Sequence, residues 1–229
     1  MSSLSPNLKL YLHEQKKLSE RVILEDCVNA VNLVAGVDVS YSNDGKYACA
    51  VIIVLDAETR EVCEQVHSVG IPDFPYVPQF LAYREMPLVS EAYCQLSRRP
   101  DLFFYDGNGT LHAQKCGAAS HFGVVFDVPV IGCAKNASTS ITRFSGNRGD
   151  HSPIIENGTV LGEQLVTQNG VKPLYISVGH KISLKRSIQE TLNFAPDYRL
   201  PEPIVSVVWA PRFNFSFLRQ TSNLYCWRF

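Results

Sequence analysis

The sequence predicts one α/β domain over residues 1–229, built on a mixed central β-sheet flanked by helices. Three strand-like segments, 33–42, 47–56 and 61–70, follow each other directly. Short turns separate them, and the NDGK turn at 43–46 is typical of a hairpin, so they form an antiparallel meander. Further along, strand and helix patterns alternate, which is typical of α/β proteins. No repeat or linker divides the chain.

The remaining elements follow from the spacing of apolar residues. Amphipathic patterns predict helices over 6–30, 80–98, 115–128 and 183–194. Short apolar runs predict strands over 101–106, 129–135, 159–167 and 172–179. The stretch 136–158 is polar and rich in glycine, so we expect a long loop there. The residues after about 203 fit no clear pattern and are atypical.

The composition excludes several classes of protein. A net charge of −1 argues against binding nucleic acid through a basic tail. The seven cysteines form no CxxC pair and their number is odd, so we expect a reducing compartment, cytoplasm or nucleus, the nucleolus included. No apolar run is long enough to span a membrane, so we expect no membrane association.

Three carboxylates are candidates for a metal site. Asp38 interrupts the apolar strand GVDVS, Asp106 directly follows the apolar strand DLFFY, and Glu85 lies near the start of a helix. Carboxylates at strand ends can converge on Mg²⁺, which activates water in phosphodiester hydrolysis. The spacing also permits other readings. Asp38 would then lie at a solvated edge, Asp106 would cap the next turn, and Glu85 would pair with Arg84.

Other polar residues cluster around Asp106. Lys135 follows a short strand and could neutralise charge in a phosphoryl transition state, or it could be a surface lysine. His112 and His121 could contact substrate phosphate, or they could be turn and core histidines. Cys116 could act as a thiol nucleophile, although its small neighbours favour a structural role.

Two loops could contact a nucleic acid base. Gly107, Asn108 and Gly109 expose backbone groups that could clamp a flat ligand, or they form an ordinary tight turn. Tyr76 stands in the sequence PYVP, and the neighbouring prolines, Pro75 and Pro78, would present it rigidly. Such a ring could insert into a base stack. The alternative is a proline-rich loop that packs its tyrosine on the core.

The chain resembles the endonuclease V family over residues 10–203. The resemblance rests on long motifs that occur in order: GVDVS, PYVPQFLAYRE, DLFFYDGNG, GAASHFGVVFDVPVIGCAK, PLYISVGHKIS and YRLPEP. The GNG and LYISVGH stretches are more similar to the eukaryotic branch. This resemblance implies a ribonuclease-H-like fold and cleavage at the second phosphodiester bond 3′ of inosine, with Mg²⁺ as the cofactor and Mn²⁺ as a substitute. It also implies that Asp38, Asp106 and Glu85 bind the metal and that Lys135 takes part in catalysis.

The resemblance also assigns the substrate contacts. Tyr76 would be the wedge that separates strands, and the backbone of Gly107–Gly109 would receive the flipped base. Eukaryotic members act mainly on inosine in RNA, so we expect inosine-containing single-stranded RNA as the substrate, with deaminated DNA as a second one. We expect a monomer.

One position departs from the family pattern. After LPEP, family members carry an acidic residue or a histidine that completes the metal site, and this chain has Val208 at that position. No Asp, Glu or His follows Glu202. The alternative function is therefore an inosine-RNA-binding protein with weak or no catalysis.

Overall fold

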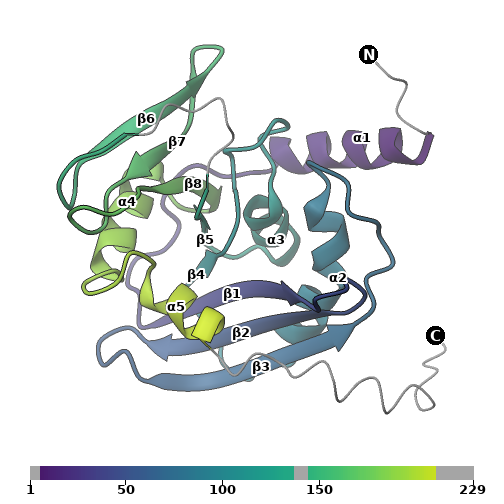
Figure 1. The fold of residues 1–229 in the computed structure, drawn as a ribbon, viewed down its shortest axis with the longest axis horizontal. Coiled ribbons are helices and arrows are strands. Elements are labelled where there is room, and N and C mark those ends of the chain that lie inside the picture. The colour runs from purple at the N-terminus through teal and green to yellow at the C-terminus, as the bar shows by residue number, and fades with distance from the viewer. Residues whose placement is uncertain (1–5, 137–143, 210–229) are drawn as a thin grey trace.

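The computed structural model describes residues 6–136 and 144–209, and its centre is one eight-stranded sheet (Figure 1). The sheet order is β3-β2-β1-β4-β5-β8-β7-β6. The strands are β1 (Leu33–Tyr41), β2 (Ala48–Asp56), β3 (Val62–Gly70), β4 (Leu102–Tyr105), β5 (Val130–Ala134), β6 (His151–Glu156), β7 (Thr159–Leu165) and β8 (Leu174–His180). The helices are α1 (Pro6–Glu20), α2 (Leu81–Cys94), α3 (Ala118–Phe126), α4 (Leu184–Asn193) and α5 (Glu202–Trp209).

The strand directions confirm the predicted α/β fold with a mixed sheet. β1, β2 and β3 form the predicted antiparallel meander. β4 runs parallel to β1, and β5 runs parallel to β4. The other three strands extend the sheet in antiparallel pairs. The parallel trio β1, β4 and β5 therefore lies in the interior of the sheet, where strand ends are close together.

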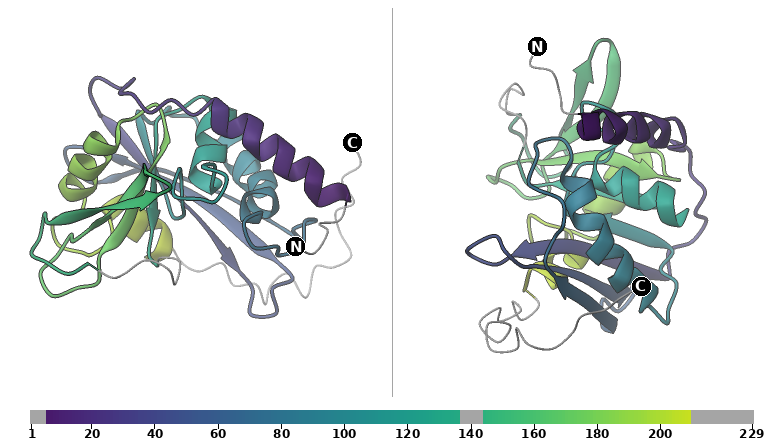
Figure 2. Two further views of the ribbon diagram at one scale, coloured as in Figure 1. Left: turned by 90° about the horizontal axis from the view of Figure 1, so that it is seen from above. Right: turned by 90° about the vertical axis from the view of Figure 1, so that its right-hand side faces the viewer.

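Helices cover both faces of the sheet, as the two turned views show (Figure 2). One apolar core packs α2 and α3 on one face, and the other packs α4 and α5 on the opposite face. Alternate residues of a strand point to opposite faces, so Phe103 and Tyr105 join the first core while Leu102 and Phe104 join the second. α1 lies outside α3.

The prediction of a continuous loop over 136–158 was wrong, because strand β6 occupies positions 151–156 within it. β6 is an edge strand in which only Ile154 is buried, so its apolar signal is weak. Asn157 and Gly158, both with positive φ, form the turn into β7. Positions 137–143 of the expected loop lie outside the described residues. The first helix is also shorter than predicted and ends at Glu20.

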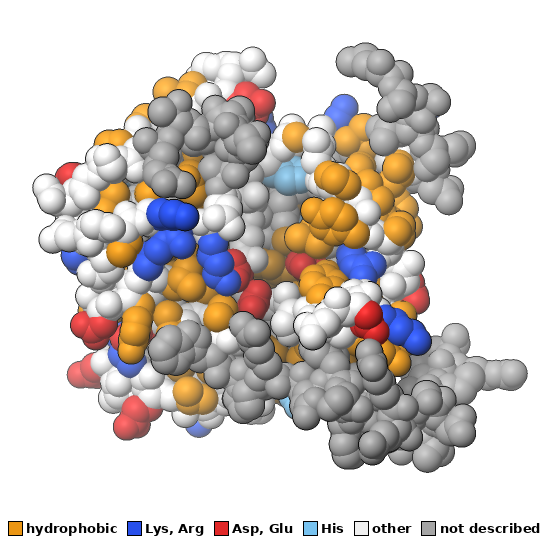
Figure 3. All heavy atoms as spheres, viewed as in Figure 1, with side chains coloured by type: hydrophobic (Ala, Val, Ile, Leu, Met, Phe, Trp, Pro, Cys, Tyr) orange, Lys and Arg blue, Asp and Glu red, His pale blue; other side chains and the backbone are white. Residues whose placement is uncertain are grey.

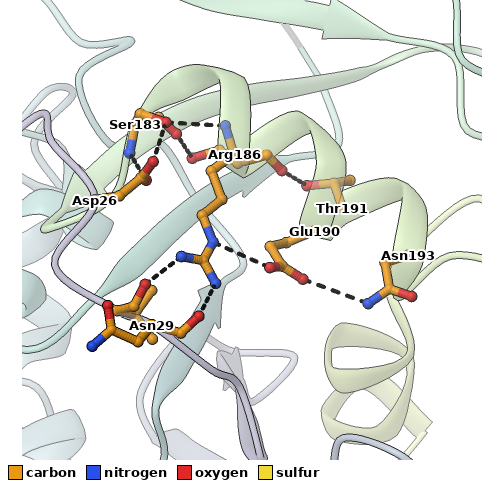
Figure 4. A network of polar contacts seen from close by, with 9 residues as sticks. Asp26, Asn29, Ser183, Arg186, Glu190, Thr191 and Asn193 are labelled. Carbon is orange, nitrogen blue, oxygen red and sulfur yellow. Dashed lines mark hydrogen bonds and ion pairs between the residues drawn. The ribbon is translucent and has the colours of Figure 1, made fainter.

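A polar network fastens the connection between α1 and β1 to α4 (Figure 4). Arg186 donates to the carbonyls of Val28 and Asn29 and pairs with Glu190 one turn later. Ser183 caps α4 by accepting from the Arg186 amide. This network fixes the entry to β1, the strand that carries Asp38.

Candidate active site

Asp38, Asp106 and Lys135 come together where the parallel strands end. Asp38 lies on β1, between β2 and β4, so it is not at an edge of the sheet. The Asp106 amide donates to the carbonyl of Val37 at 2.9 Å, which places the two aspartates side by side. Lys135 directly follows β5, the next parallel strand. The sheet therefore brings together three of the four residues proposed for catalysis.

Lys135 and Asp106 form an ion pair between Nζ and Oδ2. Burial is the main cause that raises the pKa of Asp38 to about 6, and the negative charge of Asp106 adds to it. Lys135 acts in the opposite direction. Two carboxylates in contact and partly shielded from water repel each other unless a cation or a shared proton lies near. The ion pair with Lys135 also replaces the reading in which Asp106 only caps a turn.

Glu85 reaches the same region from the opposite face of the sheet. Its carboxylate accepts hydrogen bonds from the hydroxyls of Tyr41 and Tyr105, each at 3.3 Å, and the residue is only 6% exposed. Burial raises the pKa of Glu85 to about 8, while the two hydroxyls lower it. Arg84 donates instead to the carbonyls of Phe74 and Gly45, so its guanidinium serves the neighbouring loops.

The donor set fits a hard divalent cation. Its atoms are all carboxylate oxygens, the type that Mg²⁺ and Mn²⁺ prefer. Asp38 and Asp106 would hold the ion, since their mutual repulsion would be relieved by a positive charge. Within residues 6–136 and 144–209, however, no three His, Cys, Asp or Glu side chains lie close enough to form a metal cluster. The hydroxyls of Tyr41 and Tyr105 donate to the Glu85 carboxylate, and its part in a metal site stays a prediction.

The space-filling view shows acidic and basic side chains next to each other in the middle of the molecule, where the surface is hollowed (Figure 3). Hydrophobic side chains border the hollow on one side. The basic side chains suit a phosphate backbone and the apolar border suits flat bases, whereas the acidic side chains suit a cation.

The glycine segment after Asp106 packs tightly against β8 and β5. A Cβ at Gly109 would lie 2.0 Å from the carbonyl oxygen of Val178, and a Cβ at Gly132 would lie 2.5 Å from the Gly109 amide nitrogen. Only glycine fits at position 109, because the backbone of Val178 leaves no room for a Cβ. A Cβ at Gly107 would meet the Tyr105 ring at 3.4 Å and the Ala118 Cβ at 3.9 Å, which are ordinary contact distances. Gly107 is thus free of this packing constraint.

The loop that carries Tyr76 presents the ring to solvent. Tyr76 is 70% exposed, and its neighbours Pro75 and Pro78 are exposed as well. Phe74 is the residue of this loop that packs inward, with its ring against Tyr11. The structure therefore differs from the reading in which Tyr76 packs on the core.

The two histidines and Cys116 lie below this surface. His112 is half-buried, and its Nε2 contacts the carbonyl of Gln79 at 3.1 Å. His121 is 8% exposed, stands edge-on to the ring of Tyr83, and has a pKa lowered to about 4 by burial. Cys116 is fully buried, and burial raises its pKa to about 12. A thiol that stays protonated is a poor nucleophile, so the structural reading of Cys116 is favoured.

Sequence reasoning missed several supporting residues. The sequence predicts Tyr41 and Tyr105 only as strand residues, whereas their hydroxyls donate to the Glu85 carboxylate. Arg199 lies in the YRLPEP motif, and its guanidinium donates to the carbonyl of Lys135 at 2.7 Å and to that of Pro173 at 2.8 Å. No signal along the chain indicates these contacts, because they join residues 44, 20 and 64 positions apart.

Val208 lies on α5, which crosses β1. The carbonyl of Pro203 approaches Gly36 so closely that a Cβ there would lie 1.9 Å from it. Val208 is half-buried and packs against the apolar core on this face of the sheet. In the described part of α5, the only carboxylate is Glu202, whose side chain pairs with Arg60.

Comparison with known proteins identifies the family. The endonuclease V family model matches residues 16–207. This chain belongs to the endonuclease V family. Endonuclease V of Dictyoglomus thermophilum is 41% identical over 191 residues, which is 83% of each chain. The crystal structure of the Bacillus subtilis enzyme has a TM-score of 0.86 and 36% identity, and the match covers 93% of this chain and 94% of the other.

A third relative, endonuclease V of Ciona intestinalis, was solved with a 24mer DNA that contains an inosine followed by a ribo-adenosine. It has a TM-score of 0.81 and 25% identity, and the match covers 95% of this chain and 99% of that one. Both bacterial proteins are more similar in sequence, so the eukaryotic type stays a prediction. Among the described residues, no helix is long and apolar enough to cross a membrane.

Proposed function

We propose that this protein is a divalent-metal-dependent endonuclease that cleaves single-stranded RNA at the second phosphodiester bond 3′ of inosine. Membership of the endonuclease V family supports an endonuclease that acts on deaminated nucleic acid. The observation that supports metal-dependent cleavage is the cluster of Asp38, Asp106 and Lys135 at the ends of parallel strands, while the RNA substrate and the position of the cut are proposed from the resemblance to the family. Deaminated DNA is proposed as a second substrate, since the Ciona relative was solved with an inosine-containing DNA.

Each residue has a distinct part in the proposed reaction. A bound Mg²⁺ or Mn²⁺ would supply the charge that activates water and stabilises the leaving oxygen. Asp38 and Asp106 would hold that charge in place, and Glu85, which accepts from Tyr41 and Tyr105, would complete the carboxylate set. Lys135 neutralises negative charge on the phosphate oxygens. Its side chain is 34% exposed and lies beside Asp106, so a bound phosphate could reach the ammonium group.

The exposed loops would bind the base. Tyr76 inserts beside the inosine and holds the neighbouring base out of the stack, which costs least in a single strand. The backbone of Gly107–Gly109 offers hydrogen-bonding groups to the edge of the flipped base. We further propose a cytoplasmic or nuclear location, in keeping with the six described cysteines, which are all free thiols.

A second candidate is an inosine-RNA-binding protein that turns over poorly. The observation that favours it is Val208, which places an apolar side chain on α5 where the family pattern has a metal ligand. Val208→Asp tests this candidate, with Ser206→Asp as the control on the other side of α5. If the missing ligand limits catalysis, Val208→Asp increases cleavage across a Mg²⁺ titration and Ser206→Asp does not. Equal activity of Val208→Asp and the natural chain would contradict this explanation.

The direct experiment compares RNA with one inosine and the same RNA with adenosine. Mapping the cut to the nucleotide, together with an affinity measurement in EDTA, separates the two candidates. Inosine-specific cleavage supports the endonuclease, whereas selective binding without cleavage supports the binding protein.

A further inference from the structure

The loop between β3 and α2 carries Tyr76, and other residues hold its backbone on the N-terminal side of Tyr76. The carbonyl of Phe74 accepts a hydrogen bond from Arg84. The Phe74 ring stands edge-on to Tyr11 with 4.9 Å between ring centroids, and Tyr11 in turn packs on Tyr83. An exposed ring on a loop keeps a fixed direction only if the backbone on both of its sides is held. The backbone on the C-terminal side of Tyr76 must therefore be held as well.

On the C-terminal side of Tyr76, two side chains hold the backbone of Gln79. Gln79 has φ of +73°, a left-handed conformation that residues with a Cβ adopt when surrounding contacts impose it. Its carbonyl lies 3.1 Å from Nε2 of Gln15 and 3.1 Å from Nε2 of His112. The Phe80 amide donates to the carbonyl of Val77 at 3.0 Å and closes the turn.

Gln15 also contacts the segment behind the glycine loop. Its Nε2 donates to the carbonyl of Cys116 at 2.8 Å, and the amide of Gly117 donates to the carbonyl of Gly109 at 2.9 Å. One side-chain amide thus joins the Tyr76 loop to the segment that supports Gly107–Gly109. These contacts link α1 to elements 64 and 101 residues away in the chain.

The burial of Gln15 indicates that its donors matter. Gln15 is fully buried, and its Oε1 has no hydrogen-bond partner among the described residues. An unpaired buried carbonyl oxygen is costly, and an apolar side chain of similar size would avoid that cost. The position therefore retains an amide for the two hydrogen bonds that it donates.

We propose that Gln15 is a positioning residue that holds the Gln79 carbonyl, so that Tyr76 keeps its direction relative to the glycine loop. This inference rests on the proposed function, in which Tyr76 separates stacked bases. His112 is the second holder of the same carbonyl and acts on the substrate through Tyr76. The side chains of Gln15 and His112 lie beneath the Tyr76 loop and link it to the segment that supports Gly107–Gly109.

The test uses one inosine RNA in two forms, single-stranded and within a hairpin stem. Gln15→Met removes both donors while keeping the length of the side chain. We expect the ratio of stem cleavage to single-strand cleavage to fall by about fivefold to tenfold, the size expected for the loss of one or two hydrogen bonds. Gln95→Met is the matched control, since Gln95 also donates to two backbone carbonyls but at the far end of α2.

A double-mutant cycle then separates positioning from a general structural role. In the Tyr76→Ala background, Gln15→Met is expected to cause no further fall in the ratio. His112→Leu, at a half-buried position, provides a second variant should Gln15→Met fail to fold, and the same result is expected. An unchanged ratio, an equal loss on both RNA forms, or a loss that persists without Tyr76 would overturn the proposal.

A binding measurement keeps the test independent of cleavage. A 2-aminopurine base beside the inosine becomes more fluorescent when it is unstacked, and this is measured in EDTA at saturating protein. The natural chain is expected to raise the fluorescence of the stem, and Gln15→Met to raise it less. Equal signals from the two proteins, or no rise with the natural chain, would refute the positioning role. Failure of the proposed function itself would instead appear as absence of inosine-selective cleavage and binding.

Discussion

Glu85→Gln is expected to change how the stability of the protein depends on pH. Burial raises the pKa of Glu85 from its ordinary value of 4.5 to about 8 in the folded chain. Between these two values the unfolded chain ionises while the folded chain keeps its proton, so the unfolding free energy falls as pH rises. The shift corresponds to at most about 5 kcal/mol at about 1.4 kcal/mol per pKa unit.

The variant removes this loss because glutamine carries no charge. The hydroxyls of Tyr41 and Tyr105 donate to different oxygens of Glu85, so the amide oxygen can accept from one of them while the amide NH2 donates to the other. Near pH 5 the two proteins are expected to have similar stability. At pH 9 the variant is expected to be more stable by several kcal/mol, within the limit of about 5 kcal/mol. In the presence of Mg²⁺ it is expected to lose cleavage.

The assay is urea unfolding at pH 5 to 9 in EDTA, because a metal bound to the folded state would add its own stability. Asp38 also titrates in this range, but it is present in both proteins and its contribution largely cancels in the difference. Glu91→Gln, which alters an exposed carboxylate on the same helix, should retain the pH dependence of the natural chain. Parallel curves for Glu85→Gln and the natural chain would refute the assigned burial of a protonated carboxyl.

Three further changes test the site. Lys135→Met removes the charge that lowers the pKa of Asp38, so the acidic limb of the pH–rate profile should move to higher pH and turnover should fall about a hundredfold; an unmoved limb would contradict this. Tyr76→Ala should leave the melting temperature unchanged, since the ring is 70% exposed, and should reduce cleavage of structured RNA more than of unstructured RNA; equal losses would argue against a wedge. Gly109→Ala should unfold far more easily than Gly107→Ala in urea, because only the former places a Cβ 2.0 Å from a carbonyl oxygen; similar unfolding midpoints would contradict the packing argument.

The main elements could be predicted because their signals are local. The turn at 43–46 and the apolar runs on either side of it determine the meander, and the strand predicted over 101–106 contains β4. β6 escaped prediction because an edge strand with a single buried residue carries little apolar periodicity. The sequence does not predict helix α5, because its apolar residues do not follow one helical face.

The candidate site could be predicted only in part. Asp38, Asp106 and Lys135 could be proposed because each interrupts or ends an apolar strand, and strand ends gather at one edge of a sheet. The contacts of Glu85 with Tyr41 and Tyr105, by contrast, depend on how a helix packs across a sheet. No spacing along the chain encodes such packing. The same holds for Gln15, whose partner Gln79 lies 64 residues away.

The most direct test of the proposed activity uses a single-stranded RNA with one inosine and a matched RNA with adenosine, each incubated in Mg²⁺, in Mn²⁺ and in EDTA. The proposal predicts a single cut at the second phosphodiester bond 3′ of inosine, present with either metal and absent in EDTA and in the adenosine RNA. Intact inosine RNA in both metals, or cleavage that ignores the inosine, would contradict it.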